Sequence, residues 1–140
     1  MRQSQQKLYI KKLHDLYAEI PAFKCKGCHD CCGPIIFGRI EGKLIRSYCR
    51  QNNIPIPVSR IRWQNETTEE FYPLKLDCPF LKDDGCLIYP VRPYICRLQG
   101  HVKKLPCKNN PEGMDIDEDR AKLLLHKYWF ICQRYLYARR

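Results

Sequence analysis

Cysteine content constrains this chain more than any other feature of its sequence. Ten of the 140 residues are cysteine, and four of these, at positions 25, 28, 31 and 32, lie within eight consecutive positions. So many thiols in a chain of this size indicate either a disulfide framework or metal sites. The length fits one domain with a single hydrophobic core and leaves no room for two ordinary domains.

The N-terminal segment favours metal sites over disulfides. It is interrupted by charges such as Lys7, Lys11 and Asp15, and it has neither the apolar run nor the small-residue cleavage site of a secretory signal. No stretch of the chain approaches the roughly 20 apolar residues that cross a bilayer. We therefore expect a cytoplasmic protein with no membrane partner, in which thiols stay reduced and clustered cysteines bind metal ions.

The spacing of the clustered cysteines suits metal binding. A Cys-x-x-Cys loop is tight enough to place two sulfurs on one ion, and its backbone amides can donate hydrogen bonds to the thiolates. The interval between Cys25, Cys28 and Cys31 also occurs in the ferredoxin run that holds iron–sulfur clusters. The fourth ferredoxin cysteine comes later and precedes a proline, whereas Cys32 is adjacent to Cys31. Two neighbouring cysteines reach two metals, or two corners of one polynuclear cluster, more naturally than one ion.

The other six cysteines fall into two groups. Four are widely spaced in the second half of the chain, at Cys78, Cys86, Cys96 and Cys107. Together with the first cluster they supply eight thiolates, which is enough for two four-thiolate sites. The remaining two, Cys49 and Cys132, fall in the apolar stripes of predicted helices. We expect these two to be small buried side chains and not metal ligands.

Hydrophobic periodicity predicts three long helices. Apolar residues recur at three- and four-residue intervals over residues 3–20, 41–52 and 115–138. Asp115, with Glu118 three residues later, is expected to begin the last helix as its N-cap. The expected apolar face of that helix is Ala121, Leu124, Leu125, Tyr128, Ile131, Cys132 and Tyr135.

The region between the second and third predicted helices carries the β signal. The turn sequence Lys-Asp-Asp-Gly at 82–85 predicts a β-hairpin with Cys78 and Cys86 on its two strands. A further strand is predicted over residues 72–76, and a short helix from Pro93 through Cys96.

The predicted fold class follows from these elements. Residues 99–113 are expected to form a loop in which His101 is solvated, with nitrogen ligation of a metal as the alternative for this histidine. We predict a small α+β fold, with residues 1–140 forming a single metal-stabilised domain. Helices over 3–20 and 115–138 flank a short β-hairpin and the cysteine-rich loops.

Three motifs stand in order along the chain: Cys25-x-x-Cys28-x-x-Cys31-Cys32, Cys78-Pro-Phe-Leu81, and Gly85-Cys86-x-Ile88-Tyr89-x-x-Arg92-Pro93-x-x-Cys96-Arg97. They resemble the CxxCxxCC (YkgJ-type) cysteine-cluster family, whose members are described as zinc- or iron-chelating proteins. The resemblance covers a motif core of residues 23–107. It implies metal ligation by Cys25, Cys28, Cys31, Cys32, Cys78, Cys86 and Cys96, with Cys107 as a less distinctive addition.

Two metal groups suit these thiolates, an iron–sulfur cluster such as 4Fe–4S and zinc. We favour the cluster, because the three-residue repeat lies nearer the ferredoxin pattern than the paired Cys-x-x-Cys knuckles of zinc ribbons. Arg92 and Arg97 flank Cys96 in the sequence. They are either solvated surface charges or donors of hydrogen bonds to anionic sulfur, which would tune the site.

The chain carries a formal net charge of +10. Part of this charge offsets the thiolates, and the rest is either solvated surface or a weak nucleic-acid-binding face at Lys43, Arg46, Arg50, Arg60, Arg62 and Trp63. The chain has no Gly-rich phosphate loop, nucleophile elbow or catalytic pair of carboxylates.

Three functions are compatible with these features. The first candidate is a metal-binding protein with a redox or accessory enzymatic role. The alternatives are a zinc-stabilised nucleic-acid-binding module and a metal chaperone or metal-dependent enzyme.

Overall fold

The computed structural model of the protein describes residues 2–22, 37–56, 78, 80–82, 85–109 and 115–139. Four α-helices, one 3-10 helix and a two-stranded antiparallel sheet lie in these segments, which confirms the predicted α+β class. In chain order the elements are α1 (Arg2–Ala18), α2 (Arg39–Gln51), β1 (Leu81–Lys82), β2 (Gly85–Cys86), η1 (Tyr89–Val91), α3 (Tyr94–Leu98) and α4 (Glu118–Arg139).

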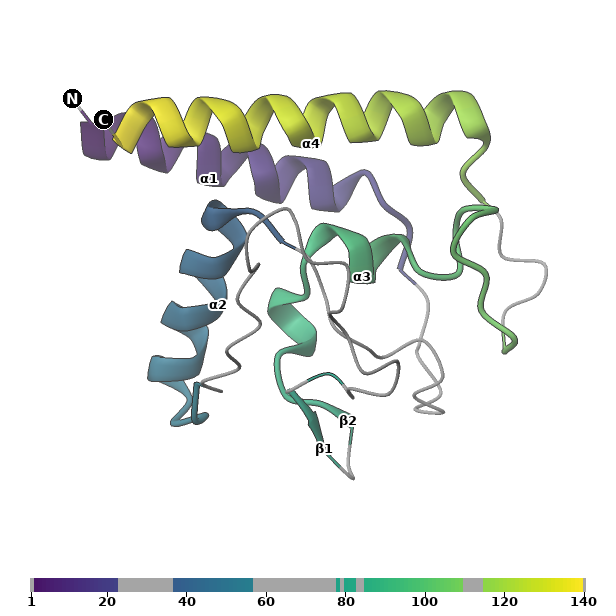
Figure 1. The fold of residues 1–140 in the computed structure, drawn as a ribbon, viewed down its shortest axis with the longest axis horizontal. Helices are drawn as coiled ribbons and strands as arrows, with labels where there is room; N and C mark the ends of the chain where they lie inside the picture. Colours follow the sequence, from purple (N-terminus) through teal and green to yellow (C-terminus); the bar gives the residue numbers. More distant parts are fainter. Residues whose placement is uncertain are drawn as a thin grey trace, which may run out of the picture.

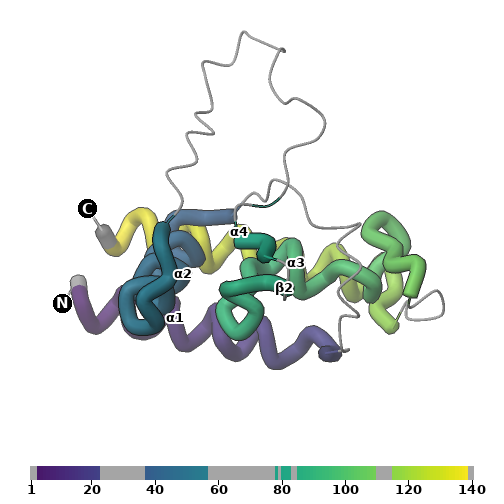
Figure 2. Tube along the Cα trace, turned by 90° about the horizontal axis from the view of Figure 1, so that it is seen from below, coloured from purple at the N-terminus to yellow at the C-terminus, as the bar shows by residue number. Residues whose placement is uncertain are grey.

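Helices α1 and α4 lie side by side and form one layer of the molecule (Figures 1 and 2). Their buried faces meet in a core cluster that includes Leu13 and Leu16 of α1 and Leu124 and Ile131 of α4. The three- and four-residue spacing of these side chains places them on one face of each helix. At the far end of α1, Glu19 accepts hydrogen bonds from Arg120 at 3.0 Å and from Lys127 at 2.9 Å.

A second layer holds α2, the hairpin and α3 on one side of this helix pair (Figure 1). Ile40 of α2 joins the first core cluster, while Ile45 and Cys49 belong to a second cluster with Phe80 and Ile88. Helix α2 therefore packs against the long helices at its first turn and against the hairpin region along the rest of its length. The predicted cysteine ligands in the second half of the chain belong to this second layer.

The three predicted long helices are confirmed, but α4 begins differently from the expected pattern. The backbone N–H of Arg120 donates to Oδ1 of Asp117 at 2.7 Å, so Asp117 is the N-cap. The assignment of Asp115 as N-cap was wrong, because the carboxylate of Asp115 contacts His101 instead. Leu125 was wrongly placed on the buried face and is 44% exposed, since it lies about 100° around the helix from Leu124.

The hairpin is shorter than expected. Only two residues of each strand pair, with Leu81 opposite Cys86 and Lys82 opposite Gly85. Cys78 precedes β1 and does not lie on a strand. Beyond Cys86 the chain turns into η1, because Pro90 lacks the N–H that a longer strand needs and suits the first turn of a helix. The strand predicted over 72–76 lies outside the described residues.

Candidate metal centre

The eight predicted ligands divide between two parts of the chain. Cys25, Cys28, Cys31 and Cys32 lie outside the described residues. The other four, Cys78, Cys86, Cys96 and Cys107, are described, and each is partly buried. The structure therefore describes the surroundings of the second set of four cysteines.

Cys78 has the surroundings of a thiolate ligand. Burial raises the pKa of its thiol, and hydrogen bonds from the backbone N–H groups of Phe80 and Leu81 to its sulfur act in the opposite direction. The N–H of Leu81 also donates to the carbonyl of Cys78 at 2.9 Å, which closes the turn. Backbone donors of this kind favour anionic sulfur, whereas burial without a cation disfavours it. A bound metal cation would lower the pKa of the Cys78 thiol and so stabilise the thiolate.

The hairpin brings Cys86 next to this turn. Cys86 pairs with Leu81 across the two strands, and the following N–H of Leu87 donates to the carbonyl of Phe80 at 3.0 Å. Cys78 and Cys86 both pack against the second core cluster. Two cysteines separated by eight positions in the sequence therefore share one small region of the fold.

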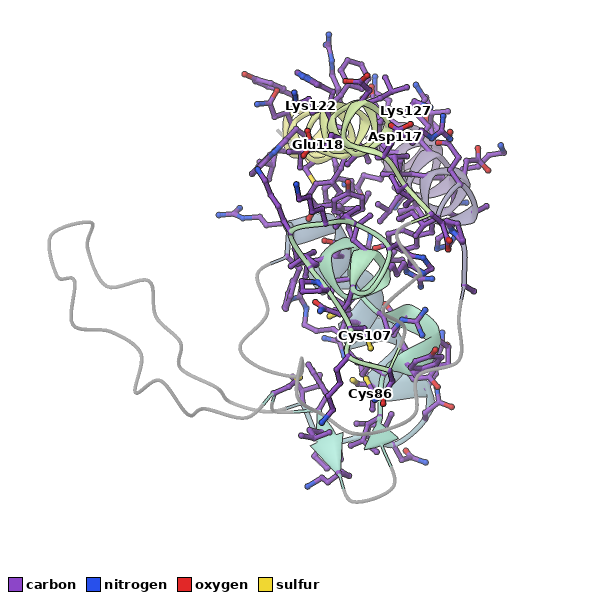
Figure 3. The ribbon with its side chains drawn as sticks, turned by 90° about the vertical axis from the view of Figure 1, so that its right-hand side faces the viewer. Cys86, Cys107, Asp117, Glu118, Lys122 and Lys127 are labelled. Carbon is purple, nitrogen blue, oxygen red and sulfur yellow. The ribbon has the colours of Figure 1, made fainter. Side chains whose placement is uncertain are left out.

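The loop after α3 folds back on itself and carries Cys107. The N–H of Gly100 donates to the carbonyl of Leu105 at 2.6 Å, and the side chain of Gln99 donates to the carbonyl of Pro106 at 2.8 Å. Gly100 has φ of 85°, a conformation that glycine adopts without strain. Figure 3 shows Cys107 and Cys86 at the hairpin end of the molecule, away from α1 and α4.

Cys96 lies on α3. The position of α3 depends on a buried carboxylate, which the sequence patterns did not indicate. Glu41 of α2 is 1% exposed. It accepts hydrogen bonds from the hydroxyls of Tyr17 and Tyr128 and from the backbone N–H of Tyr94, the first residue of α3. One carboxylate thus connects all four helices. The available signal was an acidic residue directly beside the apolar stripe of α2.

Burial of three tyrosines around this carboxylate makes the stability of the protein sensitive to alkaline pH. Burial and then the charge of Glu41 raise the pKa of Tyr94 to about 12, and raise those of Tyr17 and Tyr128 well above their ordinary value of 10.0. The folded protein keeps these protons at a pH where the unfolded chain releases them. Stability should therefore be independent of these groups below pH 10 and fall as the pH rises above it. Chemical denaturation at a series of alkaline pH values measures this slope, and Tyr17→Phe should make it shallower; an identical slope in that variant would contradict the assignment.

Arg92 and Arg97 have different surroundings. Arg97 donates from Nε to the carbonyl of Arg92 at 2.8 Å and from Nη2 to that of Pro90 at 3.0 Å, and its guanidinium lies 4.0 Å from the ring centre of Tyr17. These contacts connect η1, α3 and α1. Arg92 stacks at 3.6 Å on Tyr89, while its Nη1 atom is buried and has no hydrogen-bond partner among the described residues. A buried guanidinium nitrogen without an acceptor is costly, and it suits an adjacent anion.

His101 is not solvated as expected but is 1% exposed. Its Nδ1 lies 3.1 Å from the carboxylate of Asp115, and its carbonyl accepts the N–H of Ile116 at 3.1 Å. These bonds tie the loop after α3 to the start of α4. The loop signals around His101 concealed this, because the burial depends on residues that follow it by fourteen positions or more.

Cys49 and Cys132 lie in the two hydrophobic clusters. Burial raises the pKa of the Cys49 thiol and raises that of Cys132 to about 11. Burial raises the pKa of the Cys78 thiol as well, so this shift does not distinguish the two cysteines from the proposed ligands; their nearly complete enclosure by core side chains does. Their packing supports the prediction that neither is a ligand.

The basic face is described only in part. Lys43, Arg46 and Arg50 are at exposed or partly exposed positions of α2, and Lys43 donates to the side chain of Gln6 at 3.2 Å. Arg60, Arg62 and Trp63 lie outside the described residues. Nucleic-acid binding at this face stays a prediction.

The described side chains do not close a metal site by themselves. In the segments that the structure describes, no three His, Cys, Asp or Glu side chains group closely enough to hold a metal ion. The Cys25–Cys32 cluster lies outside those segments. The predicted set of eight ligands therefore stays a prediction.

Comparison with known proteins identifies the family. The family model described as "CxxCxxCC: Putative zinc- or iron-chelating domain" matches residues 24–118, which is more than half of the chain. The chain belongs to the CxxCxxCC family. The matched segment contains all eight candidate cysteines, and chelation of zinc or iron is the function described for the family. Neither curated proteins nor solved structures gave a match. None of the described helices is long and apolar enough to cross a bilayer.

Proposed function

We propose that this CxxCxxCC protein is a cytoplasmic metalloprotein that holds an iron–sulfur cluster, of the 4Fe–4S type, with zinc as the alternative occupant. The proposed ligands are drawn from Cys25, Cys28, Cys31, Cys32, Cys78, Cys86, Cys96 and Cys107. A cluster so held supplies one-electron redox chemistry, or an accessory redox function to a partner enzyme. No residue of the chain is assigned a catalytic role.

The observation that carries this proposal is the sulfur of Cys78. The backbone N–H groups of Phe80 and Leu81 donate to it, and Cys86 lies opposite Leu81, which comes three residues after Cys78. Amide donors around a thiolate are the usual environment of a cysteine that ligates metal, and they raise the reduction potential of iron–sulfur clusters.

The Nη1 atom of Arg92 is buried and has no hydrogen-bond partner among the described residues, which supports a role for this residue as a donor to an anionic group. Thiolate-ligated clusters carry net negative charge, so a cluster beside this nitrogen would supply an acceptor and gain a counter-charge. The proposal therefore gives Arg92 the role of hydrogen-bond donor. Arg97, which already bonds to two carbonyls, holds η1 and α3 together.

Thiol footprinting tests the proposed ligand set. Protein purified without air is alkylated before and after metal removal by a chelator, and each cysteine is quantified by mass spectrometry. We expect the eight proposed ligands to be protected only while metal is bound. In protein that remains folded after metal removal, Cys49 and Cys132 should stay protected by burial. Alkylation of Cys78 or Cys86 at the same rate with and without metal would contradict the proposal.

A further inference from the structure

Helix α2 carries a row of positive charge on the side that is turned away from the core. Its four cationic side chains recur at intervals of four, three and four residues, which places them within about 60° on one side of the helix. These residues, here called the α2 basic row, are Arg39, Lys43, Arg46 and Arg50, and all four are exposed. The buried residues Glu41 and Ile45 lie more than about 120° around the helix from the middle of the row.

No carboxylate among the described residues neutralises the α2 basic row. Lys43 donates to the side-chain oxygen of Gln6, a neutral acceptor, at 3.2 Å. None of the four cations forms an ion pair with another described residue, whereas Glu19 of α1 pairs with two cations of α4. Like charges three and four positions apart destabilise a helix. The row therefore destabilises α2, and nothing in the described part of the fold compensates for it.

The elements beside α2 add no opposite charge. Figure 1 shows the start of α1 and the end of α4 together on the α2 side of the molecule, where both termini lie. Residues 2–14, 37–56 and 120–139 contain one acidic residue, Glu41, and it is 1% exposed. The described part of this end of the molecule therefore presents positive charge to solvent and no exposed carboxylate.

An exposed aromatic ring adjoins the α2 basic row. Phe37 lies just before α2 and is 37% exposed. A Cβ atom at Gly42 would lie 3.2 Å from Cε2 of Phe37 and 3.2 Å from Nη1 of Arg46. The ring and the guanidinium therefore both rest against the bare backbone of Gly42, which brings them close together. The missing side chain at this position thus places an aromatic ring beside a cation of the row.

A line of cations beside an aromatic ring favours one class of partner, single-stranded nucleic acid. In sites for single strands, cations follow the phosphates and aromatic rings stack on the bases. Arg39 and Arg50 are about 17 Å apart along the helix axis, at a rise of about 1.5 Å per residue, so the row spans several phosphates of one strand. The centres of protein interfaces are instead apolar and depleted of lysine. One exposed ring among four cations does not supply such a centre.

We propose that the α2 basic row and Phe37 bind single-stranded nucleic acid without sequence preference. The four cations contact successive phosphates, and the ring of Phe37 stacks on one base. Compared with the basic face predicted from the sequence, this site adds Arg39 and Phe37 and consists only of described residues. It does not depend on which metal the protein holds.

Fluorescence anisotropy of a labelled oligodeoxythymidine, titrated with the metal-loaded full chain, tests this proposal. We expect binding that weakens as salt is added. Arg46→Ala/Arg50→Ala should weaken binding at low salt by roughly tenfold and flatten the slope of log affinity against log salt by about 1.4, because each phosphate contact on a single strand contributes about 0.7. Phe37→Leu should also weaken binding by roughly tenfold but leave the slope unchanged, because it removes stacking and no charge. Thermal melts would verify that both variants stay folded.

The matched control is Lys103→Ala/Lys104→Ala. It removes the same net charge from two exposed positions in the loop after α3, which Figure 1 shows on the far side of α3 from α2. Both the affinity and the salt slope should stay nearly those of the wild type, because this loop lies away from the row. Equal loss of binding in this control would overturn the proposal, since the binding would then follow net charge alone.

Three other results would also contradict it. The first is that the wild type does not bind oligodeoxythymidine. The second is tighter binding of duplex DNA than of the single strand, because a paired base is not free to stack on Phe37. The third is binding of poly-L-glutamate through the row by a chain that does not bind oligodeoxythymidine, which would indicate an acidic protein as the partner.

Discussion

Replacement of Cys78 by serine should remove bound metal and much of the folding free energy together. A serine hydroxyl is a poor ligand for the soft metals that thiolates select. The binding free energy of a structural metal site, on the order of 10 kcal/mol for zinc, is also folding free energy. We therefore expect lower metal content per chain and a lower denaturation midpoint in Cys78→Ser, measured by elemental analysis and denaturant unfolding without air.

Cys132→Ala and Cys49→Ala are the matched controls for this variant. Each removes one sulfur from a buried site in a core cluster. They should keep the wild-type metal content. Their free energy of unfolding should fall only by the packing lost with the sulfur, on the order of 1 kcal/mol. Unchanged metal in Cys78→Ser, or loss of metal in Cys132→Ala, would show that the ligands have been assigned wrongly.

Glu41→Ala should destabilise the protein by about 3–5 kcal/mol, because it leaves three hydrogen-bond donors without their acceptor, and each unsatisfied buried donor costs about 1–3 kcal/mol. The hydroxyls of Tyr17 and Tyr128 and the N–H of Tyr94 would lose their common acceptor. Since native proteins are stable by only about 5–15 kcal/mol, this loss approaches global unfolding. Denaturant unfolding of the metal-loaded protein measures the change.

Two further variants separate the role of Glu41 from a general effect of charge. Glu118→Ala removes an exposed carboxylate in the first turn of α4 and should cost less than about 1 kcal/mol. Glu41→Gln keeps one acceptor oxygen, so its loss of stability should fall between those of Glu118→Ala and Glu41→Ala. Because α3 carries Cys96, Glu41→Gln should also lose metal to a chelator faster than the wild type does. Equal stability of Glu41→Ala and Glu118→Ala would contradict the description of Glu41 as a buried hub.

The helices of this fold were predictable because their apolar residues repeat locally. Leu13 and Leu16, and Leu124 and Ile131, follow the helical period, and their burial confirms the stripes that predicted them. The true start of α4 was not predictable from its own sequence. Asp115 and Asp117 are equally good caps in isolation, and the choice is made by His101, which engages Asp115 from another loop.

The contacts around the candidate site were not predictable from the sequence. Cysteine spacing marks Cys78 and Cys86 as ligands, which stays a prediction, and the turn at 82–85 predicted a hairpin with both on its strands, whereas Cys78 lies just before β1. The role of Glu41 depends on donors that lie 24, 53 and 87 positions away in the chain. The difference between Arg92 and Arg97 depends on which carbonyls the fold brings within reach. Contacts of this range follow from packing, which no local pattern encodes.

Metal and acid-labile sulfide analysis of protein purified without air, together with its absorption spectrum, determines whether the chain holds an iron–sulfur cluster, zinc or neither. We expect brown protein that contains iron and acid-labile sulfide in equal amounts, in the proportion of a 4Fe–4S cluster, with broad absorption in the visible range. Colourless protein that contains stoichiometric zinc and no sulfide would contradict the iron–sulfur assignment. Protein that contains neither metal, when prepared in the same way, would contradict metal binding itself.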